Sequence, residues 1–145
     1  SGLMTTTHVS DVMSHQFTPV AQSLNINGVR EKLLTAPHGE LFVIDEKGGL
    51  FGTITLGDLS DSAFDHSIDD VVNARDVARL HPPSLSAADT LEGALKMMQD
   101  TGEEHVAVVE DRTSMKLVGF LHEIDVMLIY NRALLDARRE ERGEI

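Results

Sequence analysis

The sequence predicts an α+β fold built from two repeats, each with the order strand–helix–strand–strand–helix. One observation is a pattern that occurs twice, at residues 41–59 and 106–126: an apolar strand, a polar turn, and a second apolar strand opened by a glycine. The other is spacing, since Asp58 follows Gly52 at the same distance as Asp125 follows Gly119. Each copy is therefore predicted to be a buried hairpin that runs into a helix start, with one carboxylate at the junction.

The duplication extends toward the amino terminus of each copy. A shift of 65 residues aligns Asp11-Val12 with Asp76-Val77, and Thr18-Pro19 with Pro83-Ser84. A longer turn in the second hairpin raises the shift to 67 at the glycine and the aspartate. The apolar positions match better than the residue identities do, which is typical of an internal duplication. A copy of about 65 residues would be marginally stable alone, so we expect the two copies to pack together.

The repeats and their elements follow from local signals along the chain. Gly28 lies inside a helical stripe and predicts a short or loosely started helix, because glycine costs roughly 1 kcal/mol relative to alanine there. Asp89 and Glu92 have the spacing of a capping box for a helix that ends at Gly102. The first repeat is expected at residues 7–64, with a lead-in helix at 7–14, an extended entry at 17–20, a helix at 26–34 and a short helix from Asp58 through Phe64. A linker (65–73) follows, in which the polar residues 65–70 are expected to be exposed. The second repeat (74–141) is expected to end in a helix from about Ile124 to Glu141.

Composition excludes several classes of function. The net charge is −12, with 24 acidic and 12 basic residues, which disfavours nucleic acid as a partner. Cysteine is absent, so disulfides and Cys-ligated zinc are excluded. No apolar run approaches the roughly 20 residues that cross a bilayer, while the opening Ser1-Gly2-Leu3 suggests a piece of a longer protein. Phosphate-binding loops, nucleophile elbows and spaced carboxylate pairs are missing, so we expect a protein that is not an enzyme.

The two hairpins resemble a tandem pair of CBS domains (cystathionine β-synthase type), also called a Bateman module. The family pattern is Gly, two apolar residues, Ser or Thr, two variable residues, and Asp. The first copy matches it except at Thr53, and the second copy carries His122 in place of the hydroxyl residue. The resemblance covers about residues 9 to 130. It implies two copies packed sheet to sheet about a pseudo-two-fold axis, with clefts that commonly bind adenine nucleotides such as AMP, ADP or ATP.

A narrower resemblance concerns residues 70–78 and 125–138, which look like segments of bacterial ClC-type chloride channels and transporters. It implies a regulatory, cytoplasmic domain of an inner-membrane protein, with the transmembrane part of that parent as a partner. Two alternatives remain open. One is a structural module with empty clefts that serves dimerisation, and the other is a CBS energy sensor from another parent, such as an enzyme or a magnesium channel.

The candidate ligand-binding residues are those placed at the hairpin ends and at the extended entries: Thr55, Asp58, His122, Asp125, Thr18, Pro19 and Pro83. A carboxylate can accept hydrogen bonds from both hydroxyls of a ribose, and the hydroxyl of Thr55 and the N–H groups at a helix start can meet phosphate. The alternative is that both aspartates are helix caps worth about 1 kcal/mol. The duplicated spacing fits either interpretation.

The sequence predicts no metal site, and it predicts a homodimer. His122-Glu123 begins like the H-E-x-x-H motif, but Val126 stands where the second histidine is needed. The other six histidines show no ligand spacing. Leu128, Leu134 and Leu135 form an apolar stripe on the last helix, which predicts self-association into a dimer.

Overall fold

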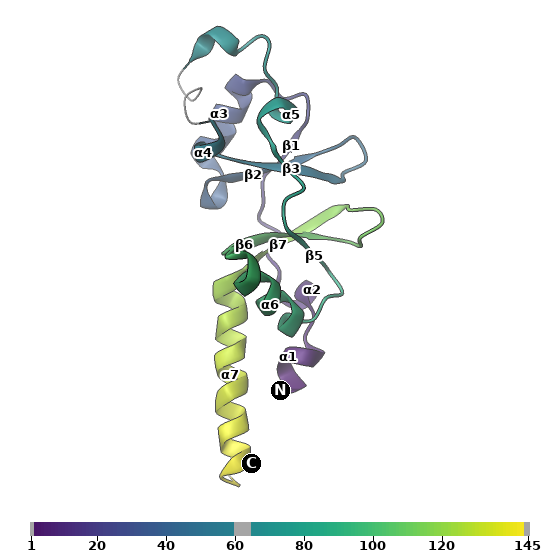
Figure 1. Ribbon diagram of the computed structural model, residues 1–145, viewed down its shortest axis with the longest axis vertical. Helices are drawn as coiled ribbons and strands as arrows, with labels where there is room; N and C mark the ends of the chain where they lie inside the picture. Colours follow the sequence, from purple (N-terminus) through teal and green to yellow (C-terminus); the bar gives the residue numbers. More distant parts are fainter. Residues whose placement is uncertain (1, 60–64, 144–145) are drawn as a thin grey trace. The chain divides into compact units, whose positions relative to one another are not determined.

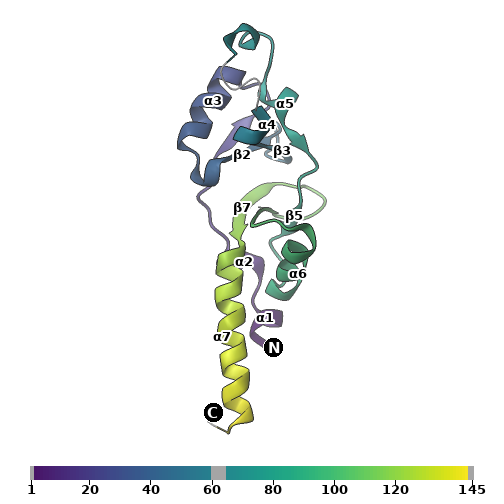
Figure 2. The ribbon, with the colours of Figure 1, turned by 60° about the vertical axis from the view of Figure 1, so that its left-hand side comes forward.

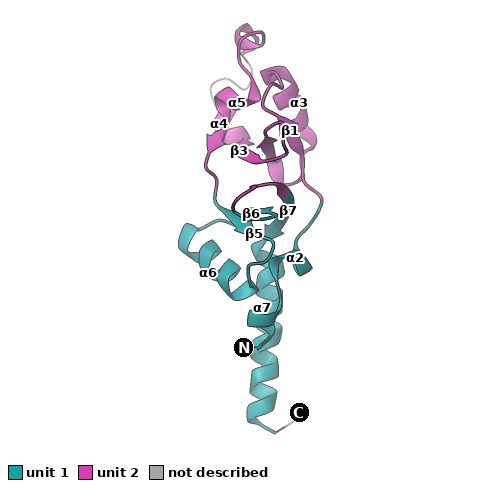
Figure 3. Cartoon of the chain, turned by 90° about the vertical axis from the view of Figure 1, so that its right-hand side faces the viewer, with its two compact units in different colours: residues 1–15, 83–112, 118–145 teal, residues 16–82, 113–117 magenta. Residues whose placement is uncertain are grey.

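The computed structural model describes residues 2–59 and 65–143 (Figure 1). The chain divides into two compact units (Figure 3): unit 1 holds residues 1–15, 83–112 and 118–145, and unit 2 holds residues 16–82 and 113–117. Each unit contains one small sheet and one apolar core. The predicted α+β class with a duplicated architecture is confirmed.

Unit 2 is built on a four-stranded sheet in the order β1-β2-β3-β4. Strand β1 runs parallel to β2, and β2 and β3 form the predicted antiparallel hairpin. Apolar side chains from the strands and from the helices that cover them make the core, which includes Ile26, Val43 and Ile54. The elements are β1 (Pro19–Ala21), α3 (Ile26–Thr35), a 3-10 turn (Pro37–Gly39), β2 (Glu40–Ile44), β3 (Leu50–Thr55), α4 (Leu56–Leu59), a second 3-10 turn (His66–Ile68), α5 (Ala74–Val77) and β4 (Arg79–Leu80).

Unit 1 is built on a three-stranded sheet in the order β5-β6-β7. Helices α1 and α6 lie alongside α7, and the carboxyl-terminal turns of α7 extend beyond both (Figure 2). The core includes Val9, Leu91, Val108 and Leu121. The elements are α1 (Gly2–Thr6), α2 (Val9–Val12), β5 (Ser84–Ser86), α6 (Leu91–Thr101), β6 (His105–Val109), β7 (Leu117–His122) and α7 (Glu123–Glu141).

Neither unit coincides with one repeat, because each hairpin packs with the lead-in segment of the other repeat. In unit 2, β4 pairs with β3, with Thr53 opposite Arg79. In unit 1, the backbone N–H of Ser14 donates to the carbonyl of Phe120 at 2.7 Å, and the reverse bond is 2.9 Å. Helices α2 and α5, 65 residues apart, begin with the same capping box, made by His8 with Asp11 and by Asn73 with Asp76. The duplication therefore extends to the hydrogen bonds of the lead-in segments.

These lead-in contacts give a physical reason for the glycine in each hairpin. A Cβ on Gly52 would lie 2.6 Å from the carbonyl oxygen of Arg79 and 3.0 Å from Cβ of Ala78. A Cβ on Gly119 would meet the side chain of Met13 and would lie 3.2 Å from the carbonyl oxygen of Ser14. Both glycines therefore leave room for the backbone of a lead-in segment.

Two predicted helix starts need correction. Helix α6 ends at Gly102 in the left-handed conformation, as predicted, but its N-cap is Thr90, whose hydroxyl accepts from the N–H of Gly93. The carboxylate of Asp89 instead accepts from the N–H of Ser86, which closes a turn before the helix. Helix α3 is also not loosely started. The side chain of Asn25 accepts from the N–H of Gly28 and caps the helix.

The prediction that residues 65–70 are exposed is wrong at Asp69. Its carboxylate accepts from the guanidinium of Arg30 in α3, which also donates to the carbonyl oxygen of Asp65 at 2.7 Å. The side chain of Asp69 is only 25% exposed. The Arg30 hydrogen bond, followed by that of His66, lowers the pKa of Asp69 below its ordinary value. The segment is therefore attached to unit 2 by an ion pair that a polar composition does not reveal.

The helices at the two ends of the chain differ from the predicted ones. The last helix begins one residue earlier than expected and buries Val126 and Ala133 on unit 1. Helix α1 was not predicted, although it places Met4 in the core of unit 1. The part of the helix predicted through Phe64 that follows residue 59 lies outside the described residues. Among the described helices, none is both long enough and apolar enough to cross a membrane.

Candidate ligand site

The strand register of unit 2 brings several predicted site residues to one edge of its sheet. Thr55, the last residue of β3, is opposite Glu40, the first residue of β2. The carbonyl of Thr18 accepts from the N–H of Phe42 at 3.0 Å, so Thr18 enters β1 at the same end of β2. Because β2 lies between β1 and β3, Thr18 and Thr55 are about 10 Å apart, two strand spacings. Asp58 follows at the same edge, in α4.

Asp58 is engaged in the start of α4, which supports the capping interpretation for the first copy. One carboxylate oxygen accepts from the backbone N–H of Thr55 at 2.8 Å and from its hydroxyl at 3.1 Å. The other oxygen lies 3.4 Å from a guanidinium nitrogen of Arg79. The carboxylate is 17% exposed and retains unused lone pairs, so it can still accept hydrogen bonds from a ligand. The Thr55 hydroxyl already donates its proton to Asp58, so this hydrogen bond would have to break before the hydroxyl could donate to a phosphate.

Arg79 is a candidate that the sequence analysis missed. It comes from β4, in the segment that opens the second repeat, yet its side chain reaches the carboxylate of Asp58 in the first repeat's hairpin. The side chain is 59% exposed, so its guanidinium is accessible to a ligand. No local sequence signal marks it, because only strand pairing across the repeat boundary brings the two residues together.

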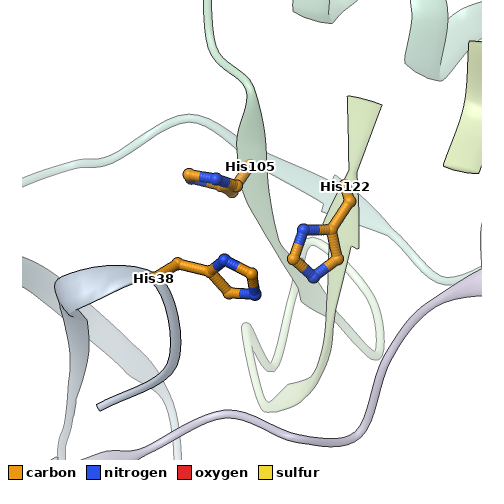
Figure 4. Close-up of side chains that lie close together, drawn as sticks. All are labelled: His38, His105 and His122. Carbon is orange, nitrogen blue, oxygen red and sulfur yellow. The ribbon is translucent and has the colours of Figure 1, made fainter. Parts of the chain in front are cut away.

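The corresponding edge of unit 1 carries different chemistry. Pro83 immediately precedes β5, His105 begins β6, and His122 ends β7. The ends of β6 and β7 are joined by a hydrogen bond from the N–H of Glu123 to the carbonyl of Glu104 at 2.8 Å. The imidazoles of His105 and His122 have centroids 5.5 Å apart (Figure 4). The sequence spacing of the histidines does not reveal this proximity, because it arises from the neighbouring ends of β6 and β7.

Asp125 differs from Asp58 in its surroundings. It occupies the third position of α7, but the N-cap residue His122 makes no side-chain cap hydrogen bond. Within the described part of the chain, the half-buried carboxylate of Asp125 has no hydrogen-bond partner, in contrast to Asp58. The capping interpretation therefore holds for the first copy and not for the second.

A cavity of about 300 Å³ lies at the opposite end of strands β1 and β2 of unit 2. It contains Pro19 but neither Thr55 nor Asp58, so the predicted site residues of the first copy do not share this cavity. Its lining comes from the segments that follow β1 and β2 and from the start of α5: Pro19, Val20, Ala21, Gln22, Ser23, Ile44, Asp45, Glu46, Asn73 and Arg75.

Two sheets covered by helices, with the same glycine–aspartate motif at one edge of each, define a duplicated α+β module. The CBS domain family model matches residues 9–64 and 74–132, most of the chain, so the chain belongs to the CBS domain family and forms a tandem CBS pair. CBS pairs are typically regulatory, non-catalytic modules.

Solved structures support the same fold. CBSX2 in complex with AMP is 25% identical with a TM-score of 0.66, over 92% of this chain and 99% of that chain. The cytosolic domain of the Mg²⁺ channel MgtE in complex with ATP is 20% identical with a TM-score of 0.69, over 85% of this chain and 48% of that chain, so this chain spans about half of it. The CBS pair of protein MJ0100 in complex with 5-methylthioadenosine and S-adenosyl-L-methionine is 20% identical with a TM-score of 0.64, over 88% and 98%. Among curated protein sequences, none matches this chain.

Proposed function

We propose that this CBS pair binds an adenine nucleotide at the sheet edge of unit 2 and thereby regulates the protein to which it is attached. The observation that carries the proposal is the arrangement of Thr55, Asp58 and Arg79, which places an acceptor-only carboxylate beside an accessible guanidinium. A ribose needs the first group and a phosphate needs the second. The adenosine-containing ligands of CBSX2, MgtE and MJ0100 support the same ligand class.

The existing hydrogen bonds define how the site accepts its ligand. The ribose hydroxyls donate to the free lone pairs of Asp58, while the backbone N–H of Thr55 keeps the carboxylate in place. The guanidinium of Arg79 is held only at 3.4 Å from Asp58, so it can turn to pair with a phosphate at little cost. Thr18 lies across the sheet edge and contacts the rest of the nucleoside.

The first copy is preferred over the second for this ligand. At the edge of unit 1, His122 replaces the hydroxyl residue, and Glu104, Glu123 and Asp125 add negative charge near the strand ends. Carboxylates repel phosphate, and the net charge of −12 adds to that repulsion, most strongly at low salt. We therefore expect AMP or ADP to bind at least as well as ATP unless a divalent cation is present.

Calorimetric titration with AMP tests the proposal, with Asp58→Ala and Asp125→Ala as a matched pair. Asp58→Ala should remove most of the binding, and Asp125→Ala should remove less. Asp58→Asn is the control for folding, because its amide oxygen can still accept from Thr55 while the charge is lost. The opposite ranking, or identical heats in both variants and the parent chain, would leave Asp58 as a helix cap only.

A thermal-shift screen identifies the ligand. A ligand at 100 times its Kd stabilises the folded chain by about 2.7 kcal/mol, so AMP, ADP, ATP and S-adenosylmethionine can be ranked on the same sample. A flat response to all four would favour the alternative of a ligand-free structural module.

The parent protein that we propose is a ClC-type chloride channel or transporter. The support is the likeness of residues 70–78 and 125–138 to ClC segments. The fold likeness to the cytosolic domain of MgtE supports a membrane-transport parent more generally and keeps a CBS sensor of another parent as the alternative. We propose that nucleotide binding is transmitted to the transmembrane part through α7 or α2. Chloride flux through the full-length protein, measured with and without AMP in the unmodified protein and in Asp58→Ala, tests the coupling.

We also propose that α7 mediates homodimer formation. Ile124, Leu128 and Leu135 are 64%, 60% and 54% exposed and follow a heptad spacing along α7. The first turn of α7 is acidic (Glu123, Asp125) and its last turn is basic (Arg138, Arg139). An antiparallel second copy would therefore bring opposite charges together and cover the apolar stripe, so a second copy of the chain is the partner that the surface fits best.

A further inference from the structure

We propose that His105 and His122 form a binding site for a divalent transition-metal ion such as Zn²⁺. The two residues are 17 positions apart in sequence, but β6 and β7 place them at neighbouring strand ends (Figure 4). Each offers a ring nitrogen, and these atoms lie within 4.8 Å of each other. The site belongs entirely to unit 1.

The geometry is close to what a shared ion requires. Zn²⁺ binds imidazole nitrogen at about 2.0–2.1 Å, so two nitrogens on one ion lie at most about 4.2 Å apart. The observed separation is within reach of a small rotation of either ring. The planes of the two imidazole rings are nearly perpendicular, at 82°, so the rings are not stacked face to face.

The surroundings hold the two imidazoles in place. The ring of Phe120 lies 4.7 Å from that of His122 and 5.5 Å from that of His105, measured between centroids, and the Phe120 residue is 2% exposed. The backbone hydrogen bond between Glu123 and Glu104 ties the two strands directly beside the histidines. Ligands held by packing lose little conformational entropy on binding.

The charge near the pair favours a cation over a phosphate. Glu104 and Glu123 are next to the two histidines in sequence, and Asp125 lies one helical turn beyond His122. The half-buried carboxylate of Asp125 has no hydrogen-bond partner among the described residues, so its negative charge is not neutralised by another described side chain. Imidazole nitrogens suit Zn²⁺ and neighbouring divalent metals. The two sheet edges of the chain would then take different ligands, a nucleotide and a metal ion.

Calorimetric titration with Zn²⁺ alone, on the whole chain without a polyhistidine tag, tests the inference. We expect one ion per chain. His122→Thr, which installs the residue found at the equivalent position of the first copy, and His105→Gln should each weaken binding by more than about tenfold, since even outer partners of a metal site contribute 10–100-fold. The control His15→Ala removes an exposed histidine of the same unit and should leave the affinity unchanged.

A second measurement keeps the test independent of variant folding. In the parent chain, Zn²⁺ should shift the side-chain NMR signals of His105 and His122 and leave those of His15 unchanged. Absence of saturable binding, unchanged affinity in both histidine variants, or shifts confined to other histidines would overturn the proposal. Nucleotide is absent from these samples, so either result is separate from the outcome of the AMP titrations.

Discussion

Replacing Gly52 by alanine is expected to destabilise unit 2, because the added methyl group has no room beside β4. A Cβ at this position would lie 2.6 Å from the carbonyl oxygen of Arg79 and 3.0 Å from Cβ of Ala78. An ordinary contact needs at least about 3.4 Å, so β4 would have to move by roughly 0.8 Å or detach from β3, and overpacking of this kind typically costs about 1–3 kcal/mol. The cost falls on backbone atoms, which cannot rotate away as a side chain can.

Two further glycines make the comparison quantitative. Gly119→Ala should cost less than Gly52→Ala, because the nearest obstacle is the flexible side chain of Met13 and the nearest backbone atom is 3.2 Å away. Gly93→Ala in α6 is the control: its Cβ would lie 3.5 Å from the hydroxyl of Thr90, an ordinary contact. Alanine there should stabilise the chain by about 0.4–1 kcal/mol through the unfolded state.

Thermal unfolding followed by circular dichroism, in buffer without nucleotide or metal, measures the ranking. For a chain of this size, 1 kcal/mol corresponds to a change in Tm of about 2–4 °C. The expected order of Tm is Gly93→Ala above the parent chain, then Gly119→Ala, then Gly52→Ala. A Gly52→Ala variant that unfolds at or above the parent Tm would refute the close approach of β4 to β3.

Three further predictions follow from burial, ionisation and surface exposure. Val108→Asp should unfold unit 1, because Val108 is fully buried and the charge would have no partner, whereas Val71→Asp should not, because Val71 is 74% exposed; the two melting curves decide it. The pKa of Asp69 in the folded chain is below its ordinary value of 3.8, so its contribution to stability should be complete above about pH 4 and lost as the pH falls through the lowered pKa. Urea unfolding between pH 5 and pH 2 should therefore show a weaker pH dependence for Asp69→Asn than for the unmodified chain. The unmodified chain should be dimeric by light scattering at tens of micromolar, and the double variant Leu128→Glu/Leu135→Glu should be monomeric. A monomeric mass for the unmodified chain would contradict the role assigned to α7.

Local patterns predicted the elements that depend only on neighbouring residues. The hairpin strands β2–β3 and β6–β7, the end of α6 at Gly102, and α7 within one residue of its start are all confirmed. Predictions failed where a side chain had more than one possible backbone partner. Asp89 and Thr90 both suit an N-cap by residue type, and only the turn closed by Asp89 leaves the cap to Thr90.

For the candidate site, the sequence predicted residues but not their surroundings. Spacing identified Asp58 and Asp125 as equivalent, yet the first is held by Thr55 and Arg79 and the second is not engaged in this way. Arg79 was missed because it reaches the site through strand pairing with a segment more than 20 residues away. Hydrogen-bond partners of this kind have no periodic signal along the chain.

The sequence by itself determined the duplication, the two hairpins and the resemblance to the CBS pattern, because these depend on apolar periodicity and on repeated local spacing. Only the tertiary structure decided that each lead-in segment packs with the other repeat's hairpin, which explains Gly52 and Gly119. It also brought His105 beside His122. The physical reason is that strand pairing joins residues distant in sequence through backbone hydrogen bonds. All residue types can accept these bonds and all except proline can donate them, so they leave no mark in the sequence.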